Sequence, residues 1–177
     1  MAVVTTNSPA ITSANTIPPV AVNAGKGASF RVRSNDGHVA VASGDSIASQ
    51  FRAVRIPSNA VVKNVMVENT ALGALVTGDI GLYYPATSPD LAIGQTALAA
   101  INAGFFGTAV SLVAASAPVD VTNESGVYTL DKRNQPIWQA VGLTADPGGK
   151  FDVVITQLGA ATAAAGFVRL VVTYVEM

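Results

Sequence analysis

His38 is the only histidine of the chain, and most catalytic chemistry available to this sequence would have to use it. A Ser-His-Asp triad needs an imidazole as its base, and a zinc or iron site needs several His, Cys or carboxylate ligands. The chain has no cysteine and no G-x-S-x-G segment; VASGDS, residues 41–46, has the wrong order. We therefore predict a protein that is not an enzyme, with no catalytic residue, no metal site and no cofactor.

Two polar segments could bind ions, but neither has the spacing that ion binding needs. In residues 23–27, NAGKG, the first glycine of a phosphate-binding loop would fall on Val20, and Gly27 stands where Ser or Thr is needed. The oxygens of Asp120, Asn123 and Glu124 could bind calcium, yet their spacing matches no EF-hand loop. A linker and an Asx-rich turn are the simpler interpretations.

Glycoside hydrolysis is not indicated either. It needs two carboxylates flanking a sugar-binding cleft, and the eleven acidic residues are scattered, mostly in turns. Trp138 is the only tryptophan and lies on the apolar side of a short predicted helix, which favours a place in the core.

The basic residues are unevenly distributed along the chain. Six of the ten fall between residues 26 and 63, where only Asp36 and Asp45 oppose them. One interpretation is a basic patch that docks on an acidic protein surface, and its members would be Arg31, Arg33, Arg52 and Arg55. The other is a solvated outer strand face. With a net charge of −1 and only a modest basic patch, we expect no direct contact with nucleic acid.

Charged residues are scarce in the whole chain. They make up 12% of it, against about 25% in an average soluble protein. We infer that part of the surface is covered by other copies or by a larger partner; the alternative is a monomer with an Ala/Thr/Ser-rich surface. Residues 91–119 carry no charge, but polar residues and glycines interrupt them and Asp90 and Asp120 flank them, so we expect no membrane span.

Residues 1–27 are predicted to form an extended N-terminal arm. They contain Pro9, Pro18 and Pro19, and Pro-Pro excludes helix. The segment lacks the basic and apolar regions of a secretory signal, so we expect use without export. Its anchor on a neighbouring subunit would be Ile17, Pro18, Pro19 and Val20; the alternative is a disordered tail.

The rest of the chain, residues 28–177, is predicted to be one β-sandwich domain. Strand-like runs are separated by turn signals. They are residues 29–33, 39–42, 47–56, 61–68, 79–84, 151–158 and 167–175, with Asn35-Asp36-Gly37 as a turn between the first two. Val61, Val65 and Val67 should share one face. Residues 167–175 should be central and covered on both faces.

Residues 134–142 predict a short helix that Asn134 caps and Gly142 ends, whereas residues 91–119 fit a short helix or a buried strand. The fold class is all-β: an antiparallel, jelly-roll-like sandwich of about eight strands with one short helix.

Residues 51–85, FRAVRIPSNAVVKNVMVENTALGALVTGDIGLYYP, together with the closing segments FDVVITQL and GFVRLVVTYV, resemble structural proteins of tailed bacteriophages. The similarity covers residues 28–84 and 151–175, and it is to head decoration (cement) proteins. The resemblance implies a non-enzymatic virion protein on the capsid exterior, assembled in the host cytoplasm. Its partners would be the major capsid protein and sister copies in a trimer or dimer, with no membrane contact. The alternative is a receptor- or glycan-binding β-sandwich module of a tail or fibre.

Overall fold

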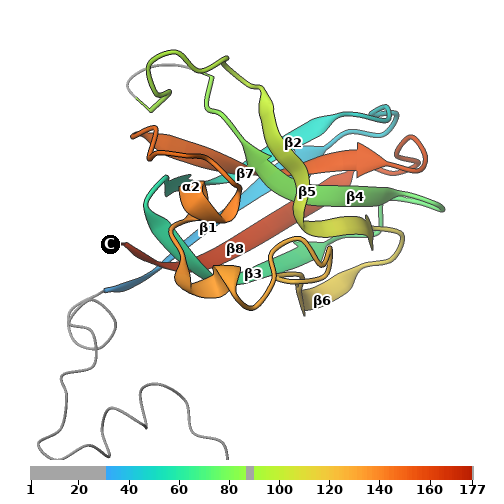
Figure 1. The fold of residues 1–177 in the computed structure, drawn as a ribbon. Helices are drawn as coiled ribbons and strands as arrows, with labels where there is room; N and C mark the ends of the chain where they lie inside the picture. Colours follow the sequence, from blue (N-terminus) through green and yellow to red (C-terminus); the bar gives the residue numbers. More distant parts are fainter. Residues whose placement is uncertain (1–30, 87–89, 177) are drawn as a thin grey trace, which may run out of the picture. The chain divides into compact units, whose positions relative to one another are not determined.

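Eight strands in two four-stranded sheets form the domain (Figure 1). The computed structural model describes residues 31–86 and 90–176. The predicted arm therefore lies outside the described residues. The strands are β1 Val32–Val41, β2 Gln50–Pro57, β3 Ala60–Asn69, β4 Thr77–Tyr83, β5 Ala100–Ser111, β6 Ser116–Asp120, β7 Lys150–Leu158 and β8 Gly166–Glu176. A 3₁₀ turn, η1 Lys132–Asn134, and one helical turn, α2 Ile137–Ala140, lie between β6 and β7.

The strand order is that of a jelly roll. Sheet A has the order β1-β8-β3-β6, and sheet B has the order β2-β7-β4-β5. The antiparallel pairs β1–β8, β2–β7, β3–β6 and β4–β5 join the first half of the chain to the second half in reverse order. A long antiparallel hairpin that rolls into two facing sheets gives this pairing. The predicted all-β jelly-roll sandwich is thus confirmed.

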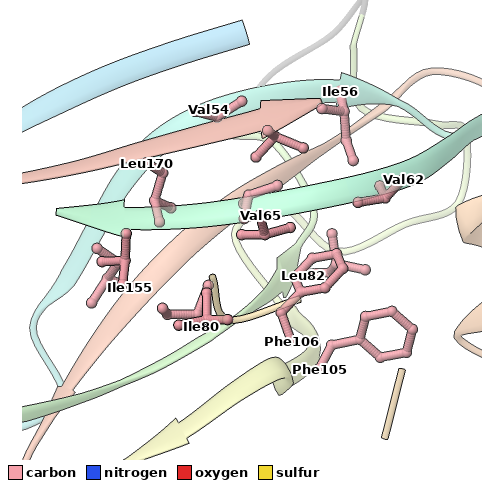
Figure 2. Packing of buried hydrophobic residues seen from close by; sticks show 14 of the residues in the cluster. Val54, Ile56, Val62, Val65, Ile80, Leu82, Phe105, Phe106, Ile155 and Leu170 are labelled. Carbon is pink, nitrogen blue, oxygen red and sulfur yellow. The ribbon is translucent and has the colours of Figure 1, made fainter. Parts of the chain in front are cut away.

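The core lies between the two sheets, where the inward-pointing side chains of the strands meet (Figure 2). On β8 these residues are Val168, Leu170, Val172 and Tyr174, all buried, as the sequence alternation predicts. Phe105 and Phe106 of β5 pack edge to face, with ring centroids 5.1 Å apart. Burial of large aliphatic and aromatic side chains from both sheets is the main source of stability in a chain without disulfides.

The outer face of β8 corrects one expectation. β8 is central, between β1 and β3, but the described residues do not cover both of its faces. Phe167 is 51% exposed, and Val171 and Val175 are half-buried. Arg169 and Thr173 share this outer face, and such polar residues fit a face that water reaches.

The predicted turn at residues 35–37 is wrong. Asn35, Asp36 and Gly37 lie inside β1 and pair with Val172, Val171 and Leu170 of β8. Gly37 serves a close approach between strands: a Cβ there would lie 2.0 Å from the carbonyl oxygen of Ala53 on β2. The turn-like composition therefore reflects packing between two strands, and not a change of chain direction.

Two local details also differ from the sequence-based expectations. The pairing of β3 with β8 shifts register between Val62 and Asn64, so Val62 joins Val65 and Val67 in the core, whereas Val61 is buried outside that cluster. The predicted helix is a single turn. The residue at its N-cap is Pro136, without a side-chain capping hydrogen bond, whereas Gly142 follows its end with φ +90°.

The uncharged segment 91–119 contains two strands and no helix. β5 and β6 occupy residues 100–111 and 116–120. In the part of the chain that the structure describes, no helix is long and apolar enough to cross a membrane.

Candidate interaction surfaces

Two of the four predicted docking arginines form an ionic network on the outer face of sheet B. Arg52 and Arg55 of β2 both reach Asp152 of β7, a carboxylate that is only 3% exposed. The Arg52 Nη1 atom lies 3.1 Å from Asp152 Oδ2. Arg55 Nη1 lies 2.8 Å from Asp90 Oδ2, and Lys150 Nζ lies 3.0 Å from Asp90 Oδ1. The three basic and two acidic side chains of this network therefore pair with one another within the domain.

The network shifts the pKa values of Arg55 and Asp90. Hydrogen bonds to Asp152 and then to Asp90 raise the pKa of Arg55, although partial burial acts in the opposite direction. Hydrogen bonds from Lys150 and then Arg55 hold the pKa of Asp90 below its ordinary value of 3.8. Arg55 and Asp90 are therefore both charged at neutral pH.

The same network anchors the loop of residues 84–99, between β4 and β5. Arg52 donates to the backbone carbonyls of Tyr84 and Leu98, both at 3.1 Å. The backbone N–H of Lys150 donates to the carbonyl of Asp90 at 2.9 Å. These arginines thus have intramolecular partners that the sequence did not reveal, and their role in docking stays a prediction.

The other predicted interface residues lie elsewhere. Arg33 of β1 pairs with Glu176 of β8 at 2.8 Å, and its side chain is 53% exposed. Arg31 is exposed and directly precedes β1. The predicted anchor, Ile17, Pro18, Pro19 and Val20, lies outside the described residues.

His38 lies on the outer face of sheet A. Its ring packs edge to face against Phe167, with centroids 5.9 Å apart. An open groove of about 400 Å³ is lined by His38, Glu68, Asn69, Thr70, Phe167 and Arg169. Arg169 pairs with Asp36 and Glu68, each at 3.1 Å. The groove presents an aromatic ring beside hydrogen-bonding groups, but it contains no nucleophile activated by a base.

The candidate calcium ligands are engaged by other groups. Asp120 accepts from Thr122 and from Asn64, whose Nδ2 lies 2.9 Å from Asp120 Oδ2. Asn123 accepts from Arg133, and Glu124 accepts from the N–H of Thr108. Among residues 31–86 and 90–176, no three His, Asp or Glu side chains group closely enough to hold a metal ion. The bond from the N–H of Thr122 to Asp120 Oδ1, two residues earlier, is that of an Asx turn, whereas the other bonds link separate segments of the chain.

A third surface lies at the end of the sandwich that is at the right of Figure 1. We call it the loop end: residues 42–49, 70–76, 112–115 and 159–165, the four connections β1–β2, β3–β4, β5–β6 and β7–β8. Its one charged residue is Asp45. Hydrogen bonds join each loop to the next: Gly44 N to Thr162 O at 2.8 Å, Ala163 N to Leu72 O at 2.9 Å, and Leu72 N to Leu112 O at 3.2 Å.

The sequence alone does not reveal this surface, although charged residues are scarce along the whole chain. Each loop by itself is only a short segment rich in Ala, Gly and Ser. The jelly-roll pairing brings the four of them together, because alternate connections of such a fold meet at the same end. The low charge of the four segments can be read in the sequence, but only the strand order shows that they form one surface.

The fold is similar to chains in two solved phage capsids. One chain of the capsid asymmetric unit of cyanophage Pam1 matches with a TM-score of 0.51 and 22% identity, over 92% of this chain and 97% of that chain. One chain of the capsid of Ralstonia phage GP4 matches with a TM-score of 0.55 and 15% identity, over 83% of this chain and 85% of that chain. At these identities the likeness shows a shared fold. No family model and no curated protein matches the sequence.

Proposed function

We propose that the protein is a non-enzymatic structural component of a phage particle. On this proposal it is a decoration (cement) protein that binds the outside of the capsid shell and stabilises contacts between major capsid subunits. The observation that carries the proposal is the jelly-roll fold, shared with capsid chains of two phages over most of both chains. The likeness extends nearly from end to end of the Pam1 chain, which supports a role for the whole protein.

The surface chemistry supports the same role. The described residues carry ion pairs and hydrogen bonds that shape loops, such as the Arg52–Asp152 pair, and no group of three His, Asp or Glu side chains that could hold a metal ion. A cement protein needs a rigid scaffold and several weak contacts, whose effects multiply through effective concentration. The proposed contacts are the arm, through Ile17, Pro18, Pro19 and Val20, and the exposed arginines Arg31 and Arg33.

Binding to purified particles tests the proposal. The full chain should sediment with capsids of its source phage, and a chain that lacks residues 1–24 should remain folded but bind more weakly. An Arg33→Ala variant should weaken binding in a salt-dependent way, because an exposed charge attracts an acidic surface only at low ionic strength. If the shortened chain binds as well as the full chain, the arm has no docking role.

The groove on sheet A favours a second candidate function, a glycan-binding module of a tail or fibre. Phe167 is 51% exposed beside the polar groups of Glu68, Thr70 and Arg169, and sugar rings stack on exposed aromatic rings. A glycan array tested with and without calcium distinguishes this function from the first. Hits that Phe167→Ala abolishes would favour it, and an array without hits would count against it.

A further inference from the structure

The loop end exposes large aliphatic side chains on three of its four loops. Ile47 is 54% exposed, Leu75 is 75% exposed and Val113 is 38% exposed. Exposed alanines lie between them, in residues 71–74, 114–115 and 161–165. Single exposed aliphatic residues are ordinary, but several on adjacent loops without intervening charge form a patch of the kind that marks an interface.

Charge distinguishes the loop end from its surroundings. Asp45 accepts a hydrogen bond from the N–H of Ala42 at 2.9 Å, so its carboxylate already has a partner in its own loop. The connections at the opposite end carry Asp90, Glu124, Asp131, Lys132, Arg133 and Asp146. Beside the loop end, on sheet A, Arg169 lies between Asp36 and Glu68. The result is an apolar centre with a charged rim on one side, the usual layout of a protein interface.

The loop end is also held in one conformation. Besides the hydrogen bonds that join the four loops, Asn69 Nδ2 donates to the carbonyls of Leu112 and Ala114, at 3.2 and 2.9 Å. Gly159 allows the closest approach: a Cβ there would lie 2.1 Å from the carbonyl oxygen of Leu75. A surface that is rigid before binding loses less conformational entropy when it binds.

Two of the exposed positions lie in hydrogen-bonded turns with unusual backbone conformations. The N–H of Ser49 donates to Ser46 O, and the N–H of Val76 donates to Gly73 O. The third residues of these turns, Ala48 and Leu75, have φ of +72° and +65°. Non-glycine residues rarely adopt such values, and strained residues cluster at functional sites. These turns hold Ile47 and Leu75 outward, away from the core.

We propose that the loop end is the surface through which copies of this chain associate. A second copy is the partner that fits, because a surface with one internally satisfied charge does not repel itself and offers a charged partner nothing to pair with. This inference deepens the proposed function, since it names the surface that would join sister copies of a cement protein, and it rests on the expectation that these copies form a trimer or dimer.

The test measures the mass of the full chain in solution, over a wide concentration series, by light scattering and sedimentation. The wild type should associate. Leu75→Glu, and separately Ile47→Glu on another loop, should weaken association about tenfold or more, because each buries a charge in an apolar contact. Ile93→Glu is the matched control, since Ile93 is fully exposed but lies on the loop of residues 84–99. Thermal unfolding should be nearly unchanged for all three variants.

A wild type that is monomeric throughout the series would overturn the inference. So would unchanged association in both loop-end variants, or an equal loss in Ile93→Glu. Binding to particles separates this result from the proposed function. A chain that associates through the loop end but never binds capsids supports the inference and contradicts the cement role. A chain that binds capsids as a monomer contradicts the inference alone.

Discussion

Gly37 of β1 and Ala53 of β2 meet where the edges of the two sheets come together. A Cβ at position 37 would lie 2.0 Å from the Ala53 carbonyl oxygen, and the Asn35 side chain donates to the carbonyl of Arg55 at 3.0 Å nearby. Since β1 and β2 are edge strands of different sheets, this contact closes one side of the sandwich.

Gly37→Ala should therefore destabilise the protein by roughly 1–3 kcal/mol, the usual cost of overpacking. Backbone atoms cannot yield as a flexible side chain does, so the two strands would have to move apart. Urea unfolding measures the change in the free energy of unfolding. Ser34→Ala, on the exposed part of the same strand, is the control and should change this free energy very little. Equal stability of Gly37→Ala and the wild type would show that the strands are not held at this distance.

Asp152→Ala should cost about 2 kcal/mol, because two arginines would lose a charged hydrogen-bond partner that is itself buried. The loop of residues 84–99 should also lose protection against hydrogen exchange, since Arg52 anchors it through Tyr84 and Leu98. Glu68→Gln removes an exposed pair with Arg169 and should cost much less than Asp152→Ala, because water screens an exposed pair. If both variants cost the same, the buried network has no special role.

Asp90 should contribute to the pH dependence of stability. Lys150 and Arg55 lower its pKa in the folded state below the ordinary 3.8, so the folded protein binds this proton less readily than the unfolded chain does. The contribution is fully present above that ordinary value and is lost as the pH falls through the folded pKa. Unfolding curves at acidic pH should show a smaller loss for Asp90→Asn than for the wild type. Parallel losses in the two proteins would contradict the pairing.

Tyr128 should contribute at the alkaline end. Burial raises its pKa above the ordinary 10.0, and its hydroxyl donates to the carbonyl of Val62 at 2.8 Å. The stability from the neutral phenol is present below pH 10 and is lost as the pH rises toward the raised folded pKa. Tyr128→Phe should cost about 1 kcal/mol at neutral pH and should show a weaker decline above pH 10. A decline as steep as that of the wild type would assign the effect to other tyrosines.

The sequence predicted the fold class because alternation in strands such as β8 is a local property. Gly37 shows where local reasoning ends: its turn-like neighbours pair with β8, a strand that is distant in the sequence, and Gly37 itself packs against Ala53 of β2. Arg52 and Arg55 were predicted to form a docking patch because few acidic residues lie near them in the sequence. Their partner in the fold, Asp152, lies about a hundred residues away along the chain. The loop end was not predicted, since four short segments acquire a common meaning only through strand order.

The most direct test of the virion role is density-gradient fractionation of the native source, with the protein followed by mass spectrometry. The proposed function predicts co-migration with DNA-containing particles, in amounts comparable to a structural subunit. A protein found only in the soluble fractions would contradict the cement role, and the jelly roll would then be the scaffold of a binding module.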